Sequence, residues 1–138
     1  MTQRALGALF AVVASACIAT VGYRAPDSLR GYEILVGERD SLSTEVAAAL
    51  RRHGFRVRRD VKGGGRPTVA AISFTFREPD PRARPWLYAR FADTRTGVIV
   101  AAVTVSLDSV PAKARSLAEA LVGAVEAQIA ERRANPAP

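Results

Sequence analysis

Hydrophobic and polar residues follow two different periods along this chain. Alternation of apolar and polar positions predicts β-strands over residues 32–37, 55–61, 68–77, 86–92 and 98–107. Apolar positions spaced by three or four residues predict helices over residues 41–53 and 112–133. The predicted order of elements is therefore β-α-β-β-β-β-α.

Residues that favour helix ends support both helices. Asp40 or Ser41 can accept a hydrogen bond from a free backbone N–H at the start of the first helix, and Gly54 favours the left-handed conformation that ends it. Asp108 or Ser109 is expected to cap the second helix in the same way. Each predicted helix thus begins beside a side chain that can satisfy an exposed backbone donor.

The alternation also divides the strands into two faces. We expect the inward face to carry Ala70, Ile72, Phe74, Phe76, Leu87, Ala89, Phe91, Ile99, Ala101, Val103, Val105 and Leu107. Two amphipathic helices most economically cover one face of a mostly antiparallel sheet of four or five strands. The predicted fold class is therefore α+β, with both helices packed on the inward face.

The opposite face of this sheet is unusually apolar for a surface that contacts only water. It would carry Ala71, Ser73, Thr75, Trp86, Tyr88, Arg90, Val98, Val100, Ala102 and Thr104. An uncovered apolar patch of this kind is typical of a partner surface. We expect the partner to contact Trp86, Tyr88, Arg90, Val98 and Val100. Self-association, or cover by a loop or by the segment that precedes the domain, is the alternative.

The N-terminus has the pattern of an export signal. Arg4 precedes the uncharged run Ala5–Ala16, and the small residues Ala14 and Ala16 stand immediately before Cys17, the only cysteine in the chain. Bacterial lipoprotein processing attaches diacylglycerol to a cysteine in this position. The pattern predicts a signal peptide over residues 1–16 and lipidation at Cys17, with simple secretion or an uncleaved membrane anchor as alternatives.

The rest of the chain divides into a tether, one domain and a tail. Residues 17–30 lack periodicity and contain glycine and proline, which predicts a tether between the lipid and the domain. Residues 31–134 contain all the predicted elements and form a single α+β domain. Residues 135–138 are expected to be a disordered tail.

The chain is strongly basic, with 20 basic residues against 13 acidic ones and a formal net charge of +7. One run contains Arg51, Arg52, Arg56, Arg58, Arg59, Lys62 and Arg66, opposed only by Asp60. An exported protein meets phosphate on lipid headgroups and anionic glycolipids, and we expect no nucleic-acid partner. Arg56 and Arg58 share a strand face, so their guanidinium groups could bind one phosphorylated headgroup. The alternative is a solvated positive face that keeps the protein soluble.

The residues offer no recognisable catalytic constellation. His53 is the only histidine, so a histidine-based metal site lacks a second ligand of its kind. No serine has the glycine neighbours of a nucleophile elbow, and the carboxylates are scattered singly. The glycines at 63–65 lack the spacing of a phosphate-binding loop. We therefore expect a non-enzymatic protein without a metal or a cofactor.

Several of these features together resemble the lipopolysaccharide-assembly lipoproteins of Gram-negative bacteria. They are Cys17, the tripeptide at 22–24, a first helix that ends near Gly54, strands joined at Asp93–Gly97 and an alanine-rich last helix over Ala112–Arg133. The resemblance implies two helices packed on one sheet and a lipid anchor. It also implies a periplasm-facing domain at the outer membrane, rather than the inner one, and an outer-membrane β-barrel as protein partner.

The same outline is similar to the lipoproteins of curli secretion and to those that activate peptidoglycan synthases. The resemblance therefore predicts an accessory subunit of an envelope assembly machine, with lipopolysaccharide assembly as the first choice. A role in a secretion or peptidoglycan-synthesis complex is one alternative. A stand-alone module that binds wall polymer or lipid phosphate is the other.

Overall fold

The computed structural model describes residues 26–61, 65–76, 79–80 and 82–136. Its elements are the 3-10 helix η1 (Pro26–Gly31), the strands β1 (Glu33–Leu35), β2 (Arg56–Arg58), β3 (Thr68–Phe76), β4 (Trp86–Asp93) and β5 (Ile99–Ser106), and the helices α1 (Ser41–Arg52) and α2 (Ala114–Ala134). The strands form one sheet in the order β2-β1-β3-β4-β5. The predicted α+β class and the predicted order of strands and helices are confirmed.

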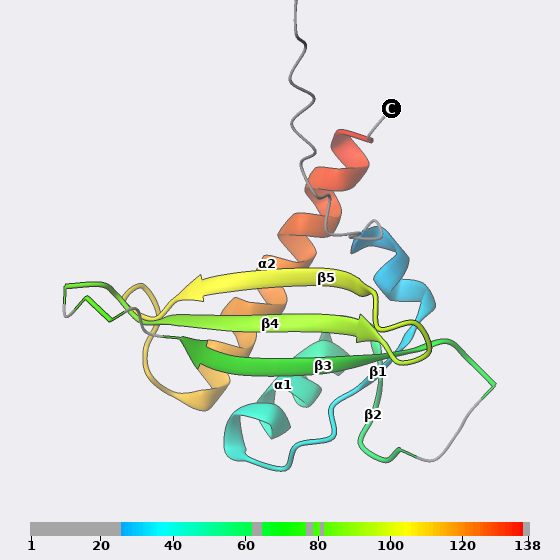
Figure 1. Cartoon of the computed structure of the whole chain (residues 1–138), viewed down its shortest axis with the longest axis horizontal. Coiled ribbons are helices and arrows are strands. Elements are labelled where there is room, and N and C mark those ends of the chain that lie inside the picture. The colour runs from blue at the N-terminus through cyan, green and yellow to red at the C-terminus, as the bar shows by residue number, and fades with distance from the viewer. Residues whose placement is uncertain (1–25, 62–64, 77–78, 81, 137–138) are drawn as a thin grey trace, which may run out of the picture.

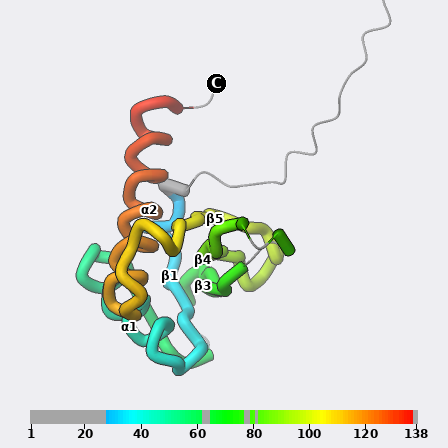
Figure 2. The backbone as a smooth tube through the Cα atoms, turned by 90° about the vertical axis from the view of Figure 1, so that its left-hand side faces the viewer, coloured from blue at the N-terminus to red at the C-terminus, as the bar shows by residue number. Residues whose placement is uncertain are grey.

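The domain has two layers, with both α-helices on the same side of the sheet (Figure 1). The view in Figure 2, turned by a right angle, places α1 and α2 on one side and β3, β4 and β5 on the other. The helices contact each other, and α2 also packs on β5 and η1. The side of the sheet that faces away from the helices is left without a covering element in the described part of the chain.

The sheet is mixed, because β1 runs parallel to both β2 and β3 while β3, β4 and β5 are antiparallel. A parallel pair needs a long crossover, and α1 supplies it between β1 and β2. The short strand β2 lies at the edge of the sheet, where its charged residues Arg56 and Arg58 oppose pairing with another chain.

The hydrophobic core lies between the sheet and the helices. Its largest fully buried side chains are Phe91, Leu29, Ile34, Leu50, Leu87, Leu121, Val69, Val100, Val122 and Val125. They come from η1, α1, α2 and four of the strands. Every element except β2 therefore contributes a fully buried side chain to one continuous core.

The folded part of the chain begins earlier than the sequence suggested. Residues 26–30 were expected to belong to the tether, but they form most of η1, and Leu29 within it is fully buried. Arg30 fixes the same segment from outside, because its guanidinium binds Glu126 of α2 and lies 4.5 Å from the centre of the Phe55 ring. These contacts attach η1 to the domain.

One of the two predicted helix caps is present. Asp40 caps α1, because its Oδ1 accepts a hydrogen bond of 3.0 Å from the Ser43 backbone N–H. The hydrogen bonds from Ser43, led by its side chain, hold the pKa of Asp40 below its usual value. The cap of α2 is instead Lys113, without a side-chain hydrogen bond, and Asp108 forms an ion pair with Arg84.

The strand β3 turns its large side chains to the side opposite to the predicted one. Val69 is fully buried against the helices, whereas Ile72, Phe74 and Phe76 are 48%, 39% and 43% exposed. The neighbouring strand β4 shows which face is which. Its predicted inward residues Leu87, Ala89 and Phe91 are buried, so Tyr88 between them lies on the face away from the helices. Phe74 pairs with Tyr88, and residues paired across an antiparallel ladder share a face. The prediction of an inward Ala70, Ile72, Phe74 and Phe76 is therefore wrong.

A β-bulge changes the faces at the start of β5. Phe91 pairs with Ala101 but Ala92 pairs with Ile99, so Val100 is an extra residue between them. Val100 is fully buried, which corrects its predicted place on the partner surface. Ile99, expected inward, shares the outward face with Ala92. Beyond the bulge Ala101, Val103 and Val105 are buried as predicted.

Candidate functional site

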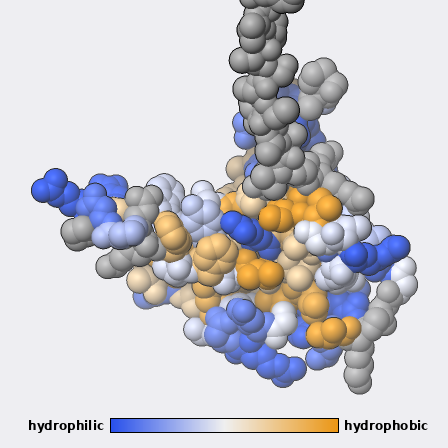
Figure 3. Space-filling view, viewed as in Figure 1, coloured by the Kyte–Doolittle hydropathy of each residue, from blue (hydrophilic) through white to orange (hydrophobic). Residues whose placement is uncertain are grey.

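The strand registers define the surface that the helices leave uncovered, which we call the open face. In β3, β4 and β5 its residues are Ala70, Ile72, Phe74, Phe76, Trp86, Tyr88, Arg90, Ala92, Ile99, Ala102, Thr104 and Ser106. Figure 3 shows hydrophobic side chains gathered on this side of the molecule, over the same strands. The large residues are concentrated where β3 ends and β4 begins.

An aromatic cluster stands at that end of the open face, formed by Phe74, Phe76 and Tyr88. The rings of Phe74 and Tyr88 are stacked, with centroids 5.4 Å apart and an interplanar angle of 5°. Phe76 meets Tyr88 edge-on, with a centroid distance of 6.1 Å. Such pairs contribute about 0.5–1.5 kcal/mol each beyond the burial of their surface. The cluster is therefore held in place before any partner arrives.

Arg90 is the charged residue of the open face in these three strands. Its guanidinium carbon lies 5.6 Å from the centre of the Phe74 ring, a cation–π contact. Among the described residues it has no ion pair, and the open face of β3, β4 and β5 carries no carboxylate. The surface thus combines exposed aromatic rings with one unneutralised positive charge.

The sequence located part of this surface and missed its larger part. Trp86, Tyr88 and Arg90 lie on the open face as predicted. Val98 precedes β5 and is half-buried, and Val100 is in the core. The missed residues are Ile72, Phe74 and Phe76. They could have been found by aligning the two strands as a hairpin with Phe76 opposite Trp86. That register places the large side chains of β3 on the same face as Trp86 and Tyr88.

Three arginines of the basic run have structural partners. Arg58 binds the Glu33 carboxylate across 3.1 Å and is only 15% exposed. Arg59 donates to the carbonyl oxygens of Glu38 and Ser43, and Arg52 binds Glu119 of α2. These guanidinium groups brace the fold. The predicted joint grip of Arg56 and Arg58 on one phosphate is not preformed, because Arg58 is already paired.

The remaining members of the basic run are exposed or outside the described residues. Arg51, Arg56 and Arg66 are exposed, and within the described ranges none of them forms an ion pair. Lys62 lies outside the described residues. The free positive charge of the run is therefore smaller than its composition suggests.

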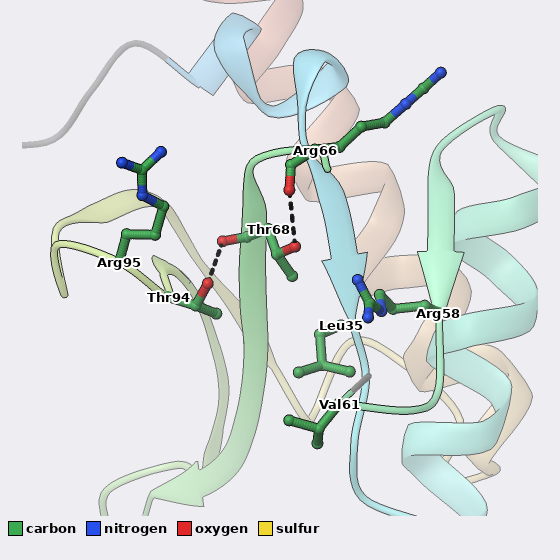
Figure 4. Close-up of a pocket in the computed structure, with 7 residues that line it drawn as sticks. All are labelled: Leu35, Arg58, Val61, Arg66, Thr68, Thr94 and Arg95. Atoms are coloured by element: carbon green, nitrogen blue, oxygen red, sulfur yellow. Dashed lines mark hydrogen bonds between the residues drawn. The ribbon is translucent and has the colours of Figure 1, made fainter. Parts of the chain in front are cut away.

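A pocket of about 240 Å³ lies where β1, β2 and β3 meet the turn that follows β4. Its lining residues are Leu35, Arg58, Val61, Arg66, Thr68, Thr94 and Arg95. Figure 4 shows that the side chains of Arg66 and Arg95 extend away from Leu35 and Val61, while Thr94 donates a hydrogen bond of 3.0 Å to the Thr68 carbonyl. The pocket has a partly apolar floor and two exposed cations at its rim.

The single histidine belongs to a network that fastens α1 to α2. His53 Nε2 lies 3.2 Å from Glu119 Oε2, and Arg52 Nε donates to Glu119 Oε1 across 2.9 Å. The hydrogen bond from Arg52, followed by that from His53, holds the pKa of Glu119 below its usual value. Across the described residues no group of three or more histidine, cysteine, aspartate or glutamate side chains is placed to hold a metal ion.

Comparisons of the chain with protein-family models, with curated proteins and with solved structures gave no match. Among the described residues, no helix is both long and apolar enough to span a bilayer. The site must therefore be interpreted from its own chemistry.

Proposed function

We propose that this chain is a non-enzymatic lipoprotein of the Gram-negative envelope that acts as an accessory subunit of an assembly machine. Lipopolysaccharide assembly is the process we favour. In this proposal acyl chains on Cys17 hold the protein on the outer membrane, and the domain faces the periplasm. Its partner is an outer-membrane β-barrel protein that packs on the open face.

The observation that carries this proposal is the exposed aromatic cluster. Exposed aromatic residues that are prearranged on a rigid sheet are typical of the centre of a protein interface, where aromatic residues and arginine dominate the binding energy. Tyr88 contacts both phenylalanines, and Arg90 adds a cation beside them. Cys17, which supplies the proposed anchor, lies outside the described residues.

A substitution within the cluster tests the docking. The full chain with an affinity tag should recover a β-barrel protein from detergent-solubilised envelopes. Tyr88→Asp should weaken that recovery by about thirtyfold, because it removes the central ring and introduces a desolvated charge. Binding is measured as the amount of barrel protein retained at increasing bait dilution.

The matched control places the same new charge elsewhere. Ala130 is an exposed residue of α2, so Ala130→Asp should recover the barrel protein as well as the parent chain does. Equal recovery by Tyr88→Asp, or no barrel protein with either chain, would contradict docking at the open face. Recovery of a secretion or peptidoglycan-synthesis component would assign the same surface to a different machine.

A second candidate function is binding of phosphorylated glycolipid or wall polymer at the pocket rim. The observation in its favour is that Arg66 and Arg95 stand exposed on both sides of the pocket, and within the described part of the chain neither has an ion pair. Near an anionic surface each basic residue contributes about 1 kcal/mol, an attraction that salt screens.

Charge reversal at the rim tests this binding. The double variant Arg66→Glu, Arg95→Glu should lose at least about thirtyfold in affinity for vesicles containing lipopolysaccharide, since two contacts of about 1 kcal/mol each are removed. Reversing the exposed pair Arg51 and Arg133, neither of which lines the pocket, is the control. Binding that ignores salt, or equal losses in both double variants, would exclude a specific rim site.

A further inference from the structure

The strand β3 is paired along its whole length on one side only. Its ladder with β4 runs from Val69 to Phe76, whereas its ladder with β1 ends where Leu35 pairs with Ala70. Figure 1 shows β3 continuing beyond β1. The part of β3 from Ala71 to Phe76 therefore forms an internal sheet edge, which we call the β3 edge.

The backbone of the β3 edge offers hydrogen-bonding groups to that vacant side. The Pro67 carbonyl accepts from Glu33 of β1, and the next carbonyl, that of Thr68, accepts from the Thr94 N–H that follows β4. Successive residues of a strand point their backbone groups to opposite sides. By this alternation Ser73 and Thr75 direct N–H and C=O away from β4. No backbone hydrogen bond outside the strand ladders joins either residue to another described residue.

The β3 edge lacks the features with which proteins protect exposed edges. Charged side chains, proline, bulges or a covering helix normally prevent an edge from pairing with another strand. The other two edges have them, since β2 carries Arg56 and Arg58, and Gln128 of α2 donates to the Ala102 carbonyl of β5 across 3.2 Å. Residues 71–76 have no charge, proline or glycine and consist mostly of good strand formers.

We propose that the β3 edge binds an extended polypeptide segment of a partner protein by β-strand addition. This inference deepens the proposed docking function, because an added strand would continue the open face. Its side chains on that face would lie beside Ile72, Phe74 and Phe76, which favours a segment with an apolar residue at every second position. Main-chain hydrogen bonds to Ser73 and Thr75 would supply the pairing.

The positive charge of this chain indicates that the partner segment is acidic. The chain has a net charge of +7, which attracts an acidic segment whichever face of the added strand carries its carboxylates. A second copy of this chain would bring the same positive charge to the edge. A segment that alternates apolar residues with acidic ones would neutralise it, and we therefore assign the edge to a foreign acidic strand.

Proline at Ser73 tests the edge without breaking the sheet. The Ser73 N–H points away from β4, so Ser73→Pro removes a donor of the edge but none from the β3–β4 ladder, and edge positions of this kind tolerate proline. Ser73→Ala keeps the N–H and is the matched control. Both are made in the full chain, which is immobilised and used to select from a phage library of random dodecapeptides.

We expect the selected peptides to alternate apolar residues and to be enriched in acidic ones. Their synthetic forms should bind Ser73→Ala like the parent chain and Ser73→Pro at least about tenfold more weakly, as expected when an edge donor is lost and the proline ring obstructs pairing. Amide exchange of Ser73 and Thr75 in the parent chain should slow at least about tenfold on peptide binding. This second measurement does not depend on how well Ser73→Pro folds.

Three results would overturn the proposal. They are selected peptides without alternation, peptides that leave the exchange of Ser73 and Thr75 unchanged, and a dimer of the parent chain that Ser73→Pro dissociates. The last result would assign the edge to a second copy. The recovery of a barrel protein by Tyr88→Asp tests docking at the open face and does not depend on the peptide experiments. Strand addition could therefore be disproved while docking at the open face is supported.

Discussion

Cys17→Ala is expected to abolish labelling of the chain by palmitate and to release the protein from the membrane fraction. The thiol is the only group in the sequence that can take the diacylglycerol of bacterial lipoprotein processing. Burial of each methylene contributes about 0.8 kcal/mol, and a single myristoyl chain binds only marginally, so a lasting anchor needs two or more chains. The measurements are gel mobility, incorporated label and the distribution between membrane and soluble fractions.

The control for this experiment leaves the cysteine in place. Arg4→Lys preserves the positive charge before the apolar run and should be labelled like the parent chain. Undiminished labelling of Cys17→Ala would overturn the lipid anchor. An unlabelled parent chain recovered in the medium would indicate simple secretion, and one retained in membranes without label would indicate an uncleaved anchor.

Phe91→Ala is expected to lower the free energy of unfolding by about 3–5 kcal/mol, which is the range for truncating a buried phenylalanine. Phe91 is fully buried, and its strand lies between β3 and β5. The substitution removes most of the side chain and leaves a cavity that the surrounding core can fill only in part. Because a domain of this size is stabilised by roughly 5–15 kcal/mol in total, much of its stability would be lost. Denaturant titration of the full chain measures the change.

Phe74→Ala provides a control with the same chemical change on the opposite face. Phe74 is exposed on the open face, so its truncation should cost about 1 kcal/mol, mainly from the aromatic contact with Tyr88. The sequence alone placed both phenylalanines inward and would predict equal losses. A larger loss for Phe74→Ala than for Phe91→Ala would show that the strand faces are assigned the wrong way round.

Local patterns predicted most of the elements correctly. The apolar stripe and Asp40 fixed α1 to within a residue at each end, because both signals lie within the helix or next to it. The alternation in β4 identified Leu87, Ala89 and Phe91 as its buried face, because Arg90 marks the opposite face as the one open to solvent. Gly97 has a positive φ of 71°, which suits the turn that joins β4 to β5.

Local sequence patterns could not predict which side chains of β3, or of the first residues of β5, face the core. In β3 the apolar Ile72, Phe74 and Phe76 alternate with Ser73 and Thr75, so the local pattern predicts the wrong face as buried, and only the pairing with β4 identifies the right one. The bulge at Val100 has no glycine or proline to mark it, and it reverses the face of Ile99. Arg58 was assigned to anion binding because its partner Glu33 is 25 residues away in the sequence.

The attachment of η1 determines how the domain would bear a mechanical load. In a lipid-anchored protein, tension from the membrane would reach the described part of the domain through η1. There Leu29 is buried, and Arg30 joins Glu126 of α2 to the carbonyl of His53 at the end of α1. Force would therefore pass into the paired helices before it could peel strands from the sheet. The domain could be held taut between the bilayer and a partner while the open face kept its shape.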